Sequence, residues 1–150
     1  MGTENSFGIS VYNRKSENEH SLKGTYHEDR QGGSITLGRP ITDMWEGNVK
    51  LKAEKTSTDW VKDQYTDENG DTRNLSDTSN STRSITLRLN RDTTNKSFNP
   101  TKGAIDIFST EFAGGIMGGD NEFSKYNMDI RRYYPGFKNQ HAWALRMKTG

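Results

Sequence analysis

The sequence contains no cysteine, which excludes disulfide frameworks, thiol catalysis and cysteine-ligated metal sites. Its three prolines, at positions 40, 100 and 135, all lie between predicted strands, where the missing N–H breaks no ladder hydrogen bond. No apolar run is long enough for a transmembrane helix. The opening residues, Met-Gly-Thr-Glu-Asn, lack the basic and apolar regions of a signal peptide. We therefore expect any export signal to lie upstream.

Hydrophobic residues are scarce, at 29% of the chain with a mean hydropathy of −1.04. Ordinary globular domains are roughly 45–50% apolar with glycine included, so a closed soluble core is hard to build from this chain. The 21 basic and 20 acidic residues are interspersed. This balance provides no concentrated basic face, and no nucleic-acid partner is predicted. At 150 residues, a single domain over 1–150 is expected.

What the chain does have is alternation of apolar and polar residues, as in His-Ala-Trp-Ala-Leu-Arg-Met at 141–147. The same pattern recurs in Phe7/Ile9/Val11, Trp45/Val49/Leu51/Ala53, Ile85/Leu87/Leu89 and Tyr126/Met128/Ile130. Successive strand side chains point to opposite faces, so each segment predicts a strand with one apolar face. This patterning, with three Trp, six Tyr and six Phe, argues against disorder.

The pattern predicts an all-β, antiparallel up-and-down meander of about seven or eight strands. The strands are expected at 6–13, 33–39, 44–56, 82–91, 103–112, 122–134 and 140–149, with a weak one near 21–28. The connections alternate in length. Those at 40–43, 92–102 and 135–139 are short or contain Pro and Gly, and those at 14–32, 57–81 and 113–121 are mostly longer. Outer-membrane barrels have this asymmetry.

Two turns test whether the apolar face is continuous. A two-residue turn at Pro135-Gly136 would pair Ile130 with His141 or Trp143, and either register puts even apolar positions beside odd ones. A straight ladder from the Asn69-Gly70 turn would instead place Leu51 opposite Arg88. We therefore predict an irregularity within 57–81. That segment carries six Asp/Glu against two Lys/Arg, which indicates a solvated, extracellular loop or protruding hairpin.

No catalytic, cofactor-binding or metal-binding residue is predicted, and the chain is not expected to be an enzyme. The three histidines, His20, His27 and His141, have no ligand spacing on a common face. The segment 67–71 lacks the ligand register of a calcium loop and indicates a polar turn. Gly114-Gly115 and Gly118-Gly119 precede a strand rather than a helix, so a flexible loop is expected instead of a phosphate cradle. No Ser/His/Asp spacing or nucleophile elbow is present.

Charged residues are concentrated on the polar strand faces. Asp129 and Glu111 are interpreted there as lumen charges in cross-strand ion pairs. Their predicted partners are Arg88, Arg131, Arg146 and Lys125, and Lys50 and Lys52 share the same face. Asp106 is an exception, because it shares parity with the apolar Phe108. Either that face points into the barrel there, or Asp106 lies near the membrane interface.

Aromatic residues gather at the ends of the predicted strands. Tyr133, Tyr134 and Phe137 lie at one short turn, Trp45 begins a strand at the same end, and Phe112 and Phe123 flank a long loop. This distribution is typical of the two aromatic girdles of a membrane barrel. The alternative is a soluble sandwich closed by aromatics at its edges.

Several segments resemble one known family. "RSITLRLNRDTTNKSFNPTKG" at 83–103 is similar to a strand, periplasmic turn and strand of the bacterial surface antigen superfamily, the family of BamA-type outer-membrane assembly factors. "EFAGGIMGGDNEFSKYNMDIRRYYP" at 111–135 resembles the next hairpin. "EDRQGGSITLGRPITD" at 28–43 and "FGISVYNRK" at 7–15 resemble earlier parts. The similarity spans nearly the whole chain and is weakest in 57–81.

The resemblance implies a transmembrane β-barrel of the bacterial outer membrane. Such a barrel inserts other outer-membrane proteins or, in sister branches, exports polypeptides. It also implies partners: outer-membrane lipid, unfolded outer-membrane protein clients that are bound by periplasmic domains not seen here, and assembly-complex lipoproteins. No position matches the family's arginine-bearing loop, so no functional residue is carried over. The chain is interpreted as the middle strands of the barrel wall.

Two other interpretations stay open at this point. One is a small soluble barrel of lipocalin type, which turns its apolar face inward. The other is a complete eight-stranded outer-membrane barrel. For an isolated piece of barrel wall, open strand edges and an exposed apolar face predict self-association.

Overall fold

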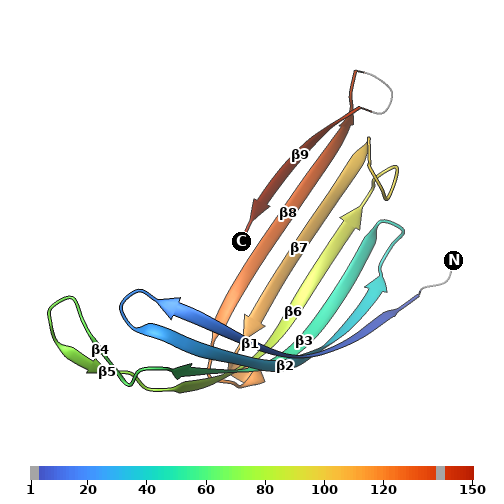
Figure 1. The fold of residues 1–150 in the computed structure, drawn as a ribbon. Helices are drawn as coiled ribbons and strands as arrows, with labels where there is room; N and C mark the ends of the chain where they lie inside the picture. The colour runs from blue at the N-terminus through green and yellow to red at the C-terminus, as the bar shows by residue number, and fades with distance from the viewer. Residues whose placement is uncertain (1–3, 138–140) are drawn as a thin grey trace.

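The computed structural model describes residues 4–137 and 141–150 as an all-β fold (Figure 1). Seven strands form one antiparallel sheet in the order β1-β2-β3-β6-β7-β8-β9. Their bounds are β1 Ser6–His20, β2 Gly24–Pro40, β3 Trp45–Trp60, β6 Thr78–Asp92, β7 Gly103–Ala113, β8 Phe123–Pro135 and β9 Ala142–Thr149. The predicted meander is therefore confirmed.

Two smaller elements lie in the connections. Strands β4 (Gln64–Thr66) and β5 (Thr72–Asn74) form a separate two-stranded hairpin between β3 and β6. A single 3-10 turn, η1 (Gly115–Met117), lies between β7 and β8. Within the described residues, no helix has the length and hydropathy needed to cross a bilayer.

The first hairpin is longer than the sequence pattern predicts. The predicted connection at 14–32 is wrong, because β1 and β2 continue as a regular ladder to the pair His20↔Gly24. A tilted strand needs only about 9–11 residues to cross a bilayer, whereas β1 has 15 residues and β2 has 17. Where a hairpin extends into water, both faces are wet, and the backbone ladder continues without apolar alternation.

The register places the alternating apolar residues on one side of the sheet. One row of cross-strand partners runs Ile9↔Ile35↔Leu51↔Ile85↔Phe112 over five strands. We call this side, which includes Leu87, the apolar face, and the opposite side, which includes Arg88, the polar face. The polar face carries the basic residues predicted for it: Lys50, Lys52, Arg88, Lys125, Arg131 and Arg146.

The two turns differ in how well the sequence predicts them. Leu51 pairs with Ile85 rather than Arg88, and the β4–β5 hairpin takes up the difference in register between the Asn69-Gly70 turn and the main sheet. Around Pro135 the predicted partners are wrong, because Ile130 pairs with Met147. The loop between the pairs is longer than two residues, and part of it lies outside the described residues. The apolar residues at even positions of β8 still pair with apolar residues at odd positions of β9, so the predicted parity is confirmed.

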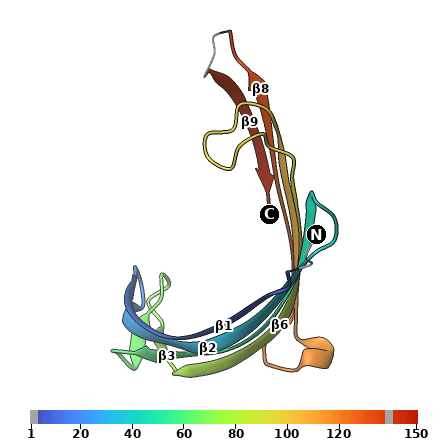
Figure 2. The same cartoon turned by 90° about the vertical axis from the view of Figure 1, so that its right-hand side faces the viewer.

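The sheet is a single curved layer that buries almost none of its apolar face (Figure 2). Its accessible surface is 11183 Å², against about 7,700 Å² for a folded soluble monomer of this mass. Among the described residues, the buried hydrophobic side chains are Ala104 and Ala113. Val11 on the apolar face is 83% exposed. No second layer formed by the described residues covers that face.

The connections segregate to the two ends of the sheet (Figure 1). We call one end the short-turn end, where β2–β3, β6–β7 and β8–β9 connect. The other is the long-loop end, where β1 and β2 extend to a turn at 21–23, the β3–β6 connection carries the β4–β5 hairpin, and residues 114–122 join β7 to β8. It is named for the hairpins that extend there. The predicted alternation in connection length is wrong for β1–β2, whose turn is short, and for β6–β7, which residues 93–102 join.

The exposed apolar face predicts how the isolated chain behaves. In plain buffer it will self-associate, because apolar patches of this extent and open strand edges associate in water. Light scattering with and without detergent measures this. A monodisperse, folded monomer in the absence of detergent would contradict the expectation that this face is covered by lipid.

Candidate functional site

The β6–β7 turn at the short-turn end fixes the register of the strands on either side. The Asn95 Oδ1 atom accepts the backbone N–H groups of Thr101 and Lys102, each at 3.1 Å. Gly103 has φ +112, and a Cβ at this position would collide with the Thr93 carbonyl oxygen. Glycine is therefore the residue that suits this conformation. The turn brings Arg91 opposite Asp106 in the ladder.

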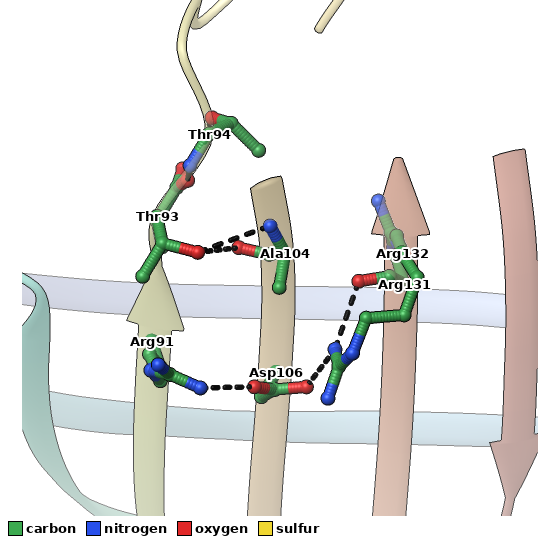
Figure 3. A network of polar contacts seen from close by, with 8 residues as sticks. Arg91, Thr93, Thr94, Ala104, Asp106, Arg131 and Arg132 are labelled. Carbon is green, nitrogen blue, oxygen red and sulfur yellow. Dashed lines mark hydrogen bonds and ion pairs between the residues drawn. The ribbon is translucent and has the colours of Figure 1, made fainter. Parts of the chain in front are cut away.

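Three charged side chains meet on the apolar face beside this turn (Figure 3). Asp106 is a buried residue, 4% exposed, and its carboxylate lies between two arginines from neighbouring strands. Arg91 Nη1 donates to its Oδ2 atom at 3.2 Å, and Arg132 Nη1 donates to its Oδ1 atom at 2.5 Å. The Arg91 guanidinium also lies 5.7 Å from the centroid of the Trp45 ring. We call Arg91, Asp106 and Arg132 the apolar-face charge cluster.

The apolar-face charge cluster explains why Asp106, a charged residue, has the same parity as apolar residues such as Phe108. Asp106 lies in the same cross-strand row as Ile130 and Met147, so the apolar face does not change sides there. Instead, the carboxylate is neutralised by arginines three residues from the start of β7. Arg132 was not among the predicted partners, although its even number, shared with Ile130 and Tyr134, already assigns it to this face.

A second cluster of the same composition lies on the polar face of the same strands. Arg131 donates to the two Asp129 carboxylate oxygens at 3.2 and 2.9 Å, and Arg146 donates to them at 3.0 and 2.6 Å. These pairs confirm the predicted partners of Asp129. We call Asp129, Arg131 and Arg146 the polar-face charge cluster. The two clusters lie on opposite sides of one layer, since Asp106 and Asp129 have opposite parity in the β7–β8 ladder.

The predicted ion pair of Glu111 is not what the structure shows. The Glu111 carboxylate accepts a hydrogen bond from Ser84 Oγ at 2.7 Å. Lys125 lies directly across the ladder from Glu111, but its ammonium is 4.7 Å from the centroid of the Phe123 ring. The buried Ser84 hydroxyl supplies a donor that does not require the flexible lysine side chain to be ordered.

Elsewhere on the polar face, the Tyr12 side chain extends over Gly32 on the neighbouring strand. Gly32 is the ladder partner of both Tyr12 and Glu54. The Tyr12 hydroxyl donates to the Glu54 carboxylate on the far side of Gly32. A Cβ at Gly32 would lie 2.8 Å from the Tyr12 hydroxyl oxygen and 2.8 Å from the Ala53 carbonyl oxygen. The absence of a side chain at Gly32 therefore makes room for a tyrosine that links three strands.

The β7–β8 loop is attached to the sheet rather than free, which corrects the expectation of a flexible loop. The Asp120 carboxylate accepts the Ser81 backbone N–H at 2.6 Å and the Ser81 hydroxyl at 2.9 Å. Asn121 Nδ2 donates to Thr82 Oγ1 at 2.7 Å, and Gly119 forms a β-bridge with Thr82. The two hydrogen bonds from Ser81 lower the pKa of Asp120.

The acidic segment 67–71 is a turn of the β4–β5 hairpin. Asp67 Oδ1 accepts the backbone N–H groups of Asn69 at 3.0 Å and Asp71 at 2.9 Å, and Oδ2 pairs with Arg73 at 2.9 Å. The Arg73 hydrogen bond, followed by the backbone donors, lowers the pKa of the Asp67 carboxyl group. These contacts support the polar-turn interpretation over a calcium loop. In the described ranges, 4–137 and 141–150, no three His, Asp or Glu residues gather as metal ligands would.

Only some of the predicted girdle aromatics lie on the apolar face. At the short-turn end, Tyr134 pairs with Trp143 on that face, and the Phe137 ring packs edge-on against Trp143 at 6.2 Å. The girdle prediction is wrong for Tyr133 and Phe123, which lie on the polar face. Tyr133 and Tyr134 are neighbours on one strand, so they point to opposite sides.

Comparison with known proteins identifies the family. The Omp85 superfamily domain matches residues 1–150. The chain belongs to the Omp85 superfamily. The outer membrane protein assembly factor BamA of Nitratidesulfovibrio vulgaris (strain Hildenborough) is 42% identical over 48 residues, which cover 32% of this chain and 6% of that protein. The chain thus spans a small part of the length of this curated relative. The resemblance noted from the sequence is confirmed.

Membership of the Omp85 superfamily assigns the chain to the bacterial outer membrane and gives the sheet an orientation. Such barrels have apolar residues outside, polar residues inside, and short turns on the periplasmic side. The apolar face is then the lipid side, and the polar face is the lumen side. Along β6, Arg83 and Arg91 bracket the apolar residues Ile85, Leu87 and Leu89. They are about 26 Å apart along the strand, or about 20 Å in depth at the usual tilt. Both arginines therefore lie near the edges of the apolar band.

Gly32→Ala will destabilise the folded sheet, because the new methyl group must displace Tyr12 or the Ala53 carbonyl. We expect a loss of about 1–3 kcal/mol, as for other overpacked sites. Gly8→Ala is the matched control, since Gly8 is also in the sheet on the polar face and its Cβ would meet no atom closer than 3.9 Å. Urea unfolding in detergent micelles measures both. Equal stability of the two variants would contradict the close packing at Gly32.

Acid will release the β7–β8 loop. The folded state lowers the pKa of Asp120 below its unfolded value of about 3.9, so the attachment is stabilising above that pH and is lost as the pH falls through the folded pKa. Hydrogen exchange of residues 78–84, corrected for intrinsic rates, will show lower protection at about pH 3 than at neutral pH. In Asp120→Asn, protection will be low at both pH values. Unchanged protection of the wild-type segment in acid would rule out this role of Asp120.

Proposed function

We propose that this chain forms part of the barrel wall of an outer-membrane protein that assembles or inserts other outer-membrane proteins, or that translocates polypeptides. The observation that carries the proposal is the Omp85 superfamily match over residues 1–150. The local similarity to an outer membrane protein assembly factor favours the assembly branch. The single-layer sheet with one apolar face is consistent with a barrel wall.

In this proposal the work of the chain is physical rather than covalent, and it is not an enzyme. The apolar face contacts lipid, and Lys50, Lys52 and Arg88 keep the polar face hydrated. Arg or Lys on the lipid face near the bilayer midplane would cost about 2–4 kcal/mol each, which accounts for the position of most basic residues on the other side. Unfolded client proteins and assembly lipoproteins would bind through parts of the protein outside this segment.

The superfamily match favours this function over the two other interpretations of the sequence. A lipocalin-type barrel needs its apolar residues to line an enclosed cavity, whereas here they lie along one side of a layer that they leave uncovered. A complete small barrel has an even number of strands in bacterial outer membranes, and the described residues form a sheet of seven.

Reconstitution tests the proposal. The whole open reading frame that encodes this chain is inserted into liposomes, and a urea-unfolded outer-membrane barrel protein is diluted into them. Client folding, followed by the change in gel mobility of the folded barrel, should be several times faster than in empty liposomes. Transfer of an added polypeptide into a protease-protected lumen would instead support translocation. Rates equal to those of empty liposomes, without transfer, would contradict both branches.

A further inference from the structure

We propose that Arg91 and Arg132, held by Asp106 on the lipid side of β6–β8, bind the phosphate group of an anionic phospholipid in the periplasmic leaflet. This site goes beyond the proposed function, because it depends on the orientation of the barrel wall and not on client assembly.

The first observation is the uncompensated charge of the apolar-face charge cluster. Two guanidinium groups share one carboxylate, so the cluster keeps one net positive charge on the apolar face, where Arg39 and Arg83 are further basic residues. The polar face of the same strands has water to solvate its own cluster. On the lipid face, an anion is the partner that lowers the cost of the remaining charge.

The second observation is the geometry of the donors. Among the described residues, Asp106 engages Nη1 of each arginine, which leaves the Nε and Nη2 groups of both for another acceptor. Each arginine side chain is 37% exposed, whereas that of Asp106 is 6% exposed. The carboxylate is thus enclosed while the guanidinium groups stay accessible. Phosphate oxygens are well matched to such paired N–H donors.

The third observation is the depth of the cluster in the membrane. Asp106 is three residues from the start of β7, which is about 10 Å along the strand. Trp45, whose ring lies beside Arg91, begins β3 at the same end. Tryptophan is enriched at the level of the lipid head groups. The free donors of Arg91 and Arg132 therefore lie where lipid phosphates are found, and the short-turn end assigns them to the periplasmic leaflet.

The two charge clusters provide matched variants for the test. The variant R91Q/D106N/R132Q removes the charge on the lipid side without leaving the buried carboxylate unpaired. The control D129N/R131Q/R146Q makes the same three kinds of change on the lumen side of the same strands. Both are made in the protein expressed from the whole open reading frame, and folding is checked by gel mobility with and without heating.

Phosphatidylglycerol is titrated into the purified protein in detergent, with phosphatidylcholine as the zwitterionic comparison, and bound lipid is counted by native mass spectrometry. The lipid-side variant should bind phosphatidylglycerol roughly tenfold more weakly than wild type, the loss expected for charge-assisted hydrogen bonds. The lumen-side control should bind as wild type does. Equal binding by the lipid-side variant, or equal loss in the control, would overturn the site.

Two further arms complete the test. Excess inorganic phosphate should not displace the lipid, and full displacement would show a general anion site and overturn the lipid assignment. If the triple variant does not fold, R91K/R132K keeps both charges and removes the planar donor fork. It should bind phosphatidylglycerol measurably more weakly than wild type, and unchanged affinity would overturn the role of the two guanidinium groups.

Discussion

The apolar face of a single-layer sheet has no partner among residues 4–137 and 141–150, and the rest of the structure follows from that constraint. Residues such as Val11 and Leu145 would be costly to leave in water. The low hydrophobic content that argues against a soluble core is sufficient to cover one side of a membrane wall. The strand ladder itself satisfies the backbone polar groups, which is a condition for any structure that crosses a bilayer.

The exposed apolar face also determines where charged residues lie. Most basic residues lie on the lumen side, and the exceptions on the lipid side are located toward the edges of the apolar band. Lys15, Lys55 and Arg83 lie toward the long loops, and Arg39, Arg91 and Arg132 lie toward the short turns. Asp106 neutralises part of the charge of the second group. Tight turns and close contacts, such as those at Gly103 and between Tyr12 and Gly32, then fix the register that keeps the two faces separate.

Much of this fold could be predicted from the sequence, because a period of two specifies both the strands and their faces. The prediction fails where the membrane ends. Residues 14–20 and 24–32 belong to regular strands, but both of their faces are wet and no apolar alternation marks them. It also fails in the turns. The partner of Ile130 depends on loop length, and the alternation fixes only which face Ile130 occupies.

The charged contacts also divide into those that the alternation predicts and those that it does not. The pairing of Asp129 with Arg131 and Arg146 could be predicted because all three share the polar face. Parity could have placed Arg91 and Arg132 on the same face as Asp106, although it does not give their pairing. The attachment of Asp120 to Ser81 joins a loop to a strand 39 residues away and leaves no periodic signal. The period of two predicts which face a strand residue occupies, but it does not predict contacts made by loop residues.

The side of β6 that carries Leu87 contacts lipid, and the side that carries Arg88 faces a wet lumen. Since the chain has no cysteine, single cysteines can be placed along β6 from 83 to 91, spin-labelled, and tested in liposomes for contact with oxygen and with a water-soluble nickel complex. Positions 85, 87 and 89 should be more accessible to oxygen, and positions 84, 86 and 88 more accessible to nickel. An absence of this alternation, or its reversal, would contradict the account.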